Sequence, residues 1–300
     1  MTDVARHETQ ARGTLGVVAA VAAWGFGPIF VKLIEMPGLT LALYRLWLGF
    51  AVMVIVMACA GRRMTWLDLK TSGACGALFG VNVSFFFTAL KHTSVADASL
   101  ITALAPVLIL VVAGPLLGER LRARDIGLTA VVIAGVALVV LGSSGQPEWS
   151  LLGDGLAVGA LVSWAAYFVA TKRARATMAT LEYQTGVLFG AALVATPVAL
   201  LSGSPLVAPH GDDWIWLLAF VLLPGAIGHL LMSWSHRFVD VSVSSLIVVA
   251  QPVVSALAAT VVLHERLGAL QLAGGAVVLA AIASVVRDHR RLEADLVAAD

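Results

Sequence analysis

Aromatic side chains occur at related positions inside long apolar segments of this sequence. Trp164 and Tyr167 are three residues apart, so they share one face if their segment is helical, and Trp24 occupies the corresponding place in an earlier, similar segment. Such rings can stack on another flat ring or attract an ammonium group. They lie deeper within the segments than the interfacial belt where Trp and Tyr normally collect. The three rings therefore indicate a binding site for a flat or cationic ligand, with packing bulk as the open alternative.

Polar side chains inside the apolar segments could meet the polar part of such a ligand. They are Asn82, Ser99, Thr102, His229, Ser244 and Gln251, and Phe86 shares a helical face with Asn82. Polar groups within a membrane usually face a cavity or the interior of a helix bundle. The Gln251 amide can donate and accept hydrogen bonds at once, and His229 can carry a proton near neutral pH. Contacts between helices for the serines, and a structural role for His229, remain open.

Charged groups are rare inside these segments. Arg45 lies about one turn inside the end of its segment, where its guanidinium could reach outward to the interface or attract a carboxylate. The carboxylates that border the segments, including Asp97, Glu119 and Glu265, all lie at segment ends. A pump for cations driven by protons would be expected to keep a deeper carboxylate. The sequence also has no Gly-rich phosphate-binding loop followed by lysine, so ATP is not the expected energy source.

The composition explains where these residues must lie. The chain has 300 residues, of which 60% are hydrophobic and 12% are charged, and its mean hydropathy is +0.94. A soluble domain is about a quarter charged, so the composition predicts an all-α integral membrane protein. Because about 20 apolar residues cross a bilayer, we expect ten spans, at residues 14–34, 38–60, 68–90, 94–117, 124–142, 153–171, 182–201, 214–235, 241–262 and 269–287.

The basic residues predict the orientation of these spans. Fifteen of the 19 Lys and Arg fall at the N-terminus, at the C-terminus or in alternate connections, against three in the opposite connections. Lys and Arg stay on the cytoplasmic side of a membrane, so both termini are expected to be cytoplasmic. The connections are short, and therefore the activity must lie inside or across the bilayer. The net charge of +1 gives no indication of nucleic-acid binding.

The sequence contains an internal duplication. The stretch from Val95 to Leu121 returns as Val241 to Leu267, which pairs Ser99 with Ser245, Pro106 with Pro252 and Glu119 with Glu265. With five spans per copy, an odd number, the second copy must enter the membrane from the opposite side. We therefore predict a 5+5 inverted repeat, with the first copy at 1–147 and the second at 148–300. Transporters built in this way hold the substrate near the midplane between the halves.

Prolines lie inside three of the predicted spans at positions that could serve transport. Pro106 and Pro252 each lack a backbone donor and clash with the carbonyl four residues back, so each should open its helix near the middle of the membrane. Pro28 is a further candidate for such a flexible point. The three prolines are predicted to break helices and to act in gating, although neighbouring helices can also repair such breaks.

The repeat pattern resembles a known family. Ten spans in two inverted copies, the proline in spans four and nine, and the endings LGER (Leu117–Arg120) and LHER (Leu263–Arg266) are similar to the drug/metabolite transporter superfamily of the EamA type. The resemblance covers nearly the whole chain. It implies export of aromatic amino acids and similar metabolites across a bacterial inner membrane. It further implies that spans one, three, four, six, eight and nine line the central cavity.

These observations lead to one preferred function and several alternatives. We expect a transporter that exports small neutral or zwitterionic metabolites, above all aromatic amino acids, by alternating access. Trp24, Phe86, Trp164 and Tyr167 would hold the ring, and the polar residues would meet the amino-acid head. We expect no cofactor, no metal and no catalytic residue, and a monomer, with a dimer left open. The alternatives are a drug or polar-metabolite exporter of the same superfamily, a channel, or an intramembrane enzyme that uses His229 with Ser233.

Overall fold

The computed structural model describes residues 3–93, 95–118, 123–143, 150–264 and 267–298, and every regular element within these ranges is a helix. A helix pairs its backbone donors and acceptors within one segment, which is what a chain needs where no water is present. The prediction of an all-α membrane protein is therefore confirmed for this part of the chain.

The helices follow one another with short connections. In chain order they are α1 (Asp3–Gly25), α2 (Gly27–Leu33), α3 (Gly38–Cys59), α4 (Trp66–Ala89), α5 (Val95–Thr102), α6 (Ala105–Leu117), α7 (Ala123–Ser143), α8 (Leu151–Arg175), α9 (Thr180–Leu201), α10 (Asp213–Phe220), the π-helix η1 (Val221–Gly228), α11 (His229–Ser235), α12 (Val241–Val248), α13 (Gln251–Val262) and α14 (Ala269–Ala298).

Seven helical stretches in the described residues are long and apolar enough to cross a membrane. They are Arg12–Leu33, Gly38–Cys59, Trp66–Ala89, Leu151–Arg175, Thr180–Leu201, Asp213–Ser235 and Val241–Val262. Three shorter apolar helices accompany them, at Asp97–Ala113, Ile126–Gly142 and Ala269–Ser284. The chain is thus a multi-pass membrane protein, while the exact number of ten spans stays a prediction.

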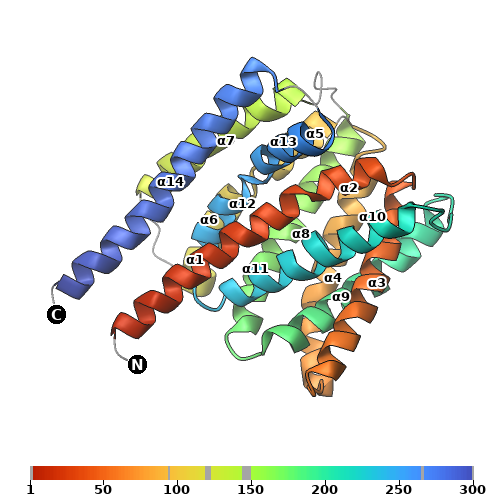
Figure 1. The fold of residues 1–300 in the computed structure, drawn as a ribbon, viewed down its shortest axis with the longest axis horizontal. Coiled ribbons are helices and arrows are strands. Elements are labelled where there is room, and N and C mark those ends of the chain that lie inside the picture. Colours follow the sequence, from red (N-terminus) through yellow and green to blue (C-terminus); the bar gives the residue numbers. More distant parts are fainter. Residues whose placement is uncertain (1–2, 94, 119–122, 144–149, 265–266, 299–300) are drawn as a thin grey trace.

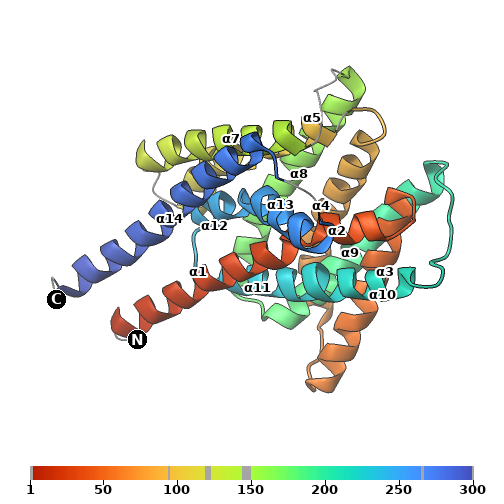
Figure 2. The same ribbon diagram turned by 45° about the horizontal axis from the view of Figure 1, so that its top comes forward.

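The helices form a bundle with one pair set apart at its edge. α7 and α14 lie side by side along one flank, and α3, α4 and α9 occupy the opposite flank (Figure 1). α1 runs between them, packed against η1, α11 and α13. The N- and C-terminal ends lie at the same end of the molecule in both views (Figure 2).

The two proline-bearing stretches of the repeat are interrupted in the same way. α5 ends at Thr102 and α6 begins at Ala105, just before Pro106; α12 ends at Val248 and α13 begins at Gln251, just before Pro252. In the first copy the Leu104 amide donates to the Ile101 carbonyl over 3.1 Å, and in the second the Ala250 amide donates to the Ile247 carbonyl over 3.0 Å. These tight i→i+3 turns replace the α-helical bonds that proline cannot continue.

Two further breaks occur in the chain. α1 ends at Gly25 and α2 begins at Gly27, with Pro28 in its first turn. In the stretch that contains Pro224, the helix widens into η1, where hydrogen bonds run from i to i+5. Such π-helical segments often mark functional sites.

Glycines on α4 and α9 let these two helices approach each other closely. A Cβ added to Gly76 would lie 2.1 Å from the Val187 carbonyl oxygen, and one added to Gly190 would lie 2.1 Å from the Gly73 carbonyl oxygen. Gly76 and Gly80, like Gly186 and Gly190, are four residues apart, the spacing that lets membrane helices approach closely. This contact fixes α4, and with it the residues that α4 contributes to the interior.

The Glu-Arg endings of the repeat, Glu119 with Arg120 and Glu265 with Arg266, lie outside the described residues, as does the predicted boundary between residues 147 and 148.

Candidate functional site

The structure gathers the predicted aromatic residues into one cluster. Trp24 of α1 lies edge-on to Trp164 of α8, with ring centroids 5.8 Å apart, and Trp164 lies 5.6 Å from Tyr167 one turn further along α8. The His229 ring, at the start of α11, lies 4.8 Å from Trp24. Four rings from three helices that are far apart in sequence therefore meet in the bundle interior. We call this group, with Phe79 and Phe168 described next, the aromatic cluster.

Two members of the aromatic cluster are not among the residues predicted from the sequence. Phe79 of α4 stacks on Tyr167 at 5.2 Å and lies 5.0 Å from His229. Phe168 lies 4.8 Å from Trp164. A sequence signal for Phe79 exists, because it is three residues before Asn82 and so lies on the same face of α4. Phe168 has no such signal, since it is one apolar residue among many on α8.

Trp24 is held in the cluster by the π-helical segment. Its indole Nε1 donates to the Pro224 carbonyl oxygen over 3.1 Å. A Cβ on Gly228 would lie 2.6 Å from Trp24 Cδ1, so only glycine leaves room for the indole there. Because a buried indole N–H needs an acceptor, the η1 backbone both positions this ring and satisfies it.

Most of the cluster is closed in this structure, although Trp164 is only partly buried. Trp24, Phe79, Tyr167 and His229 are each buried, with at most 5% of their surface exposed. Their rings fill the space between one another, and each aromatic pair stabilises the packing by about 0.5–1.5 kcal/mol beyond burial. A ligand ring would therefore enter by separating or replacing these contacts, which requires the helices that carry them to move.

The two predicted amide side chains lie at the border of the cluster and hold backbone together. Asn82 Nδ2 donates to the Ala160 carbonyl oxygen of α8 over 2.8 Å. Gln251 Nε2 lies 3.5 Å from the Trp24 carbonyl oxygen, at the limit of a hydrogen bond. The Asn82 bond ties α4 to α8, and the weaker Gln251 contact links α13 to the end of α1.

Other predicted residues lie away from the cluster. Thr102 donates to the Ala98 carbonyl within its own helix over 2.8 Å. Ser99 is partly buried and, within the described residues, makes no side-chain hydrogen bond. Ser244 is buried and lies 3.3 Å from His236 Nε2, whose ring contacts Phe168 at 4.8 Å. Ser244 is thus connected to the aromatic cluster through His236.

Phe86 also lies apart from the aromatic cluster. Its ring lies 6.0 Å from Phe87 and packs against a small apolar group formed by Ala89, Ala98 and Ala157. Although Phe79 and Phe86 are on similar faces of α4, two turns separate them. The structure therefore does not bring Phe86 together with Trp24, Trp164 and Tyr167.

The pair that suggested an intramembrane enzyme does not form a nucleophile and base. The Ser233 hydroxyl lies 2.6 Å from the His229 backbone carbonyl oxygen and 3.0 Å from Gln184 Oε1, and its one proton is shared between these two acceptors. The His229 ring instead contacts Trp24 and Phe79. A general base must reach the hydroxyl proton with its ring nitrogen, and this geometry does not provide that contact. In the described part of the chain, no three His, Cys, Asp or Glu residues are grouped to hold a metal.

Arg45 is a charged side chain of α3 that faces the π-helical segment. Its Cζ lies 4.5 Å from the centre of the Phe220 ring. Its Nε lies 3.9 Å from the place that a Cβ on Gly225 would occupy. Among the described residues the guanidinium has no acidic partner and no hydrogen-bond partner. Placing an arginine in the membrane costs about 2.5–3.5 kcal/mol, whereas a cation–π contact contributes about 0.5–2 kcal/mol. The described residues therefore compensate the charge of Arg45 only in part.

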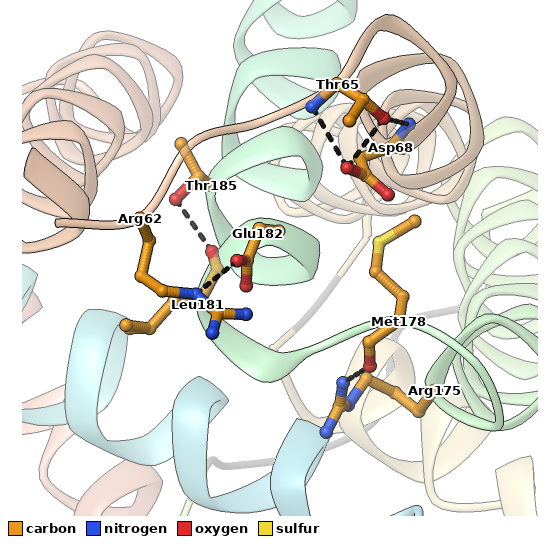
Figure 3. A network of polar contacts seen from close by, with 8 residues as sticks. All are labelled: Arg62, Thr65, Asp68, Arg175, Met178, Leu181, Glu182 and Thr185. Atoms are coloured by element: carbon orange, nitrogen blue, oxygen red, sulfur yellow. Dashed lines mark hydrogen bonds and ion pairs between the residues drawn. The ribbon is translucent and has the colours of Figure 1, made fainter. Parts of the chain in front are cut away.

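A second polar region lies where the last turn of α8 meets α9 and the connection between α3 and α4 (Figure 3). Arg175 is fully buried, and its guanidinium donates to the carbonyls of Ser233 and Met178 and to the Thr180 hydroxyl. It thereby ties α8 to α9 and α11 through groups that satisfy it, which is how a buried guanidinium is normally accommodated.

An ion pair lies beside this arginine. Arg62 Nε and Glu182 Oε1 are 2.6 Å apart (Figure 3). The hydrogen bond from this carboxylate, together with its negative charge, raises the pKa of Arg62 above its ordinary value. Nearby, Thr65 and Asp68 form a capping box that begins α4. Unlike Arg45, these charges have protein partners, so they suit an anchoring role at the helix ends.

A groove of about 540 Å³ lies between α6 and α7. It is lined by Val107, Leu110, Val111, Ile126, Thr129, Ala130, Ile133, Ala134 and Ala137. This lining offers almost no polar group, so the groove does not suit the polar head of a metabolite.

Comparisons with known proteins match most of the chain. The model of the EamA-like transporter family matches residues 11–141 and 151–287. An aromatic amino acid exporter, YddG, of Ancylobacter novellus is 30% identical over 61% of this chain and 63% of that protein. A probable terminal-alkyne amino-acid exporter of Streptantibioticus cattleyicolor is 28% identical over 90% of this chain and 92% of that protein.

A solved crystal structure shares the fold at a TM-score of 0.80 and 24% identity, over 93% of this chain and 98% of that one. The helical arrangement is therefore one that an experimentally determined protein also adopts.

Proposed function

We propose that this chain, which belongs to the EamA-like transporter family, is a secondary transporter that exports aromatic and other hydrophobic amino acids by alternating access. The observation that carries the proposal is the aromatic cluster. α1 and α4 of the first half contribute Trp24 and Phe79, and α8 and α11 of the second half contribute Trp164, Tyr167 and His229. A ring bound among them would contact both halves at once.

The duplicated architecture gives this cluster a way to open. The ten spans form a 5+5 inverted repeat of residues 1–147 and 148–300, with both termini on the cytoplasmic side of a bacterial inner membrane. The equivalent turns before Pro106 and Pro252 support this repeat, and the two separate stretches that match the family model support it as well. In such repeats one half rocks against the other around a fixed site, and the helix breaks at Pro28, Pro106 and Pro252 supply the hinges.

The ligand's amino-acid head would lie at the border of the cluster. Trp24, Trp164 and Tyr167, joined by Phe79, hold the ring, while Asn82, His229 and Gln251 lie close enough to these rings to meet polar atoms. Ser99, Thr102, Ser244 and Phe86 belong to the pathway that forms when the halves move. The two related exporters named for amino acids support this class of substrate.

Transport of labelled L-phenylalanine into proteoliposomes, measured as counterflow, tests this proposal. The change Trp164→Ala removes ring contacts worth about 1–2 kcal/mol, and so should lower transport about tenfold. Trp66→Ala is the matched control, because Trp66 is 77% exposed at the start of α4. Equal transport by Trp164→Ala and the wild type, with both proteins folded, would remove the aromatic cluster as the substrate site.

The alternatives give different results in the same assay. A transporter of drugs or other polar metabolites would let those compounds compete better than amino acids for the labelled tracer. A channel would show neither saturation nor counterflow, and an enzyme would deliver a chemically changed product.

A further inference from the structure

In the part of the chain that the structure describes, the partly buried Arg45 has no protein counter-ion. In the described residues Arg45 has neither an acidic partner nor a hydrogen bond, whereas Arg175 and Arg62 are both satisfied. A guanidinium carries five N–H donors in a planar fork. In a membrane protein such a group normally pairs with an acid or with carbonyls. Arg45 therefore has donors available for a ligand.

The surroundings of Arg45 hold it in a defined place. The Phe220 ring lies beneath the guanidinium at 4.5 Å, and that ring is itself packed against Phe30 at 6.1 Å. On another side lies Gly225, where the lack of a side chain leaves space beside Nε. An aromatic face and an open glycine backbone orient the fork without using its hydrogen-bond donors.

The same short segment connects Arg45 to the aromatic cluster. η1 presents Gly225 to Arg45, while its Pro224 carbonyl and Gly228 contact the Trp24 indole. His229, the next residue, lies within the cluster. Gly225 and His229 are four residues apart, so Arg45 and the aromatic cluster contact neighbouring parts of the same helical segment. An aromatic amino acid places its carboxylate and ring at a short separation, with only the α- and β-carbons between them.

We propose that Arg45 binds the carboxylate of the substrate whose ring lies in the aromatic cluster. The assignment rests on the proposed function and narrows the substrates to compounds that carry both a ring and a carboxylate. The planar guanidinium donates two parallel hydrogen bonds to the two carboxylate oxygens, a geometry that lysine cannot reproduce. The amides of Asn82 and Gln251 already donate toward backbone carbonyls, which leaves the carboxylate to Arg45.

The test compares an acid with its amide. L-phenylalanine and L-phenylalaninamide compete against a labelled tracer, L-tryptophan, in proteoliposomes that contain the wild type or Arg45→Gln. The wild type should prefer the acid, and Arg45→Gln should weaken competition by the acid about 10- to 100-fold while leaving the amide within about twofold. Arg63→Gln, which removes an exposed arginine in the connection between α3 and α4, is the control for charge loss.

The possible outcomes separate this assignment from the proposed function. An unchanged preference for the acid in Arg45→Gln overturns the assignment, because the arginine then only reaches toward the interface. If Arg45→Gln does not fold, Arg45→Lys decides the question: a reduced preference supports paired hydrogen bonding, and an unchanged preference overturns it. If the wild type accepts neither the acid nor the tracer, the proposed function fails and the assignment fails with it.

Discussion

The aromatic cluster and the surroundings of Arg45 both contact η1, yet they satisfy their side chains differently. In the cluster, each ring contacts other rings, and the indole N–H of Trp24 has a carbonyl acceptor. Around Arg45, a cation lies on one ring and, within the described residues, has no group that accepts its hydrogen bonds. The side chains of the aromatic cluster thus have their partners within the protein, whereas among the described residues the guanidinium of Arg45 lacks hydrogen-bond acceptors.

This difference separates two kinds of evidence for a binding site. Rings that pack against one another are compatible with a substrate site and equally with an ordinary core, because apolar contacts are made in both. A cation that remains uncompensated in the membrane has an energetic cost that a ligand can remove. The cluster thus suggests what kind of ligand fits, and Arg45 suggests that a ligand binds.

The largest effect is expected from a change that displaces Trp24 from η1. In Gly228→Leu the new side chain would occupy the position of the indole, because even a Cβ would lie 2.6 Å from Trp24 Cδ1. Transport should fall to background in the proteoliposome assay. Gly127→Leu on α7 is the control, since a Cβ there meets nothing within 4 Å. Transport by Gly228→Leu at the wild-type rate would mean that Trp24 need not stay in the cluster.

A smaller effect is expected from Phe79→Leu, which keeps the apolar volume and removes the ring stacked on Tyr167. The loss of about 0.5–1.5 kcal/mol of ring interaction should lower the preference for phenylalanine over leucine by about three- to tenfold. Competition by the two amino acids against one tracer measures that preference. Phe86→Leu should change it less than about twofold, because Phe86 packs outside the cluster. An equal effect of both changes would show that Phe86 also contacts the ring.

The smallest effect is expected from Phe220→Leu, which removes the ring beneath Arg45 but keeps the guanidinium. Because Arg45 is only partly buried, its cation–π contact should contribute about 0.5–1 kcal/mol, in the lower part of the range of about 0.5–2 kcal/mol. The KM for phenylalanine should therefore rise about two- to fivefold with little change in kcat. Phe30→Leu changes the same apolar group without removing the ring that Arg45 contacts. If both variants gave the same KM, the cation–π contact would have no role in substrate binding.

Much of the fold follows from local sequence rules. Long apolar runs and the scarcity of charge predict membrane helices, and Pro106 and Pro252 mark the places where two of the stretches break. Trp24, Trp164 and Tyr167 could be identified as candidate site residues from the sequence, because the apolar segments place their rings inside membrane helices. These rules work because they depend only on residues within one helix and on the membrane around it.

Other features depend on which helix lies beside which. From the sequence, Phe79 and Phe86 lie on similar faces of one helix. Only the packing of α4 against α8 brings Phe79 to Tyr167, and it directs Phe86 toward Ala98 and Ala157. Likewise, the spacing of the glycines on α4 indicates a close helix contact only when α9 is known to lie beside it with its own glycines.

Arg45 shows most clearly which features follow from the sequence and which depend on the packing of the helices. By itself, the sequence determined that a cation lies inside a membrane helix and near one of its ends, because hydropathy and spacing fix its depth. It left two outcomes for the side chain, outward toward the interface or inward toward a carboxylate. Only the tertiary structure decided that the guanidinium faces Phe220 and Gly225, next to the segment that holds Trp24. Depth is set by the chain and the bilayer, whereas the neighbours of a side chain are set by the packing of helices far apart in sequence.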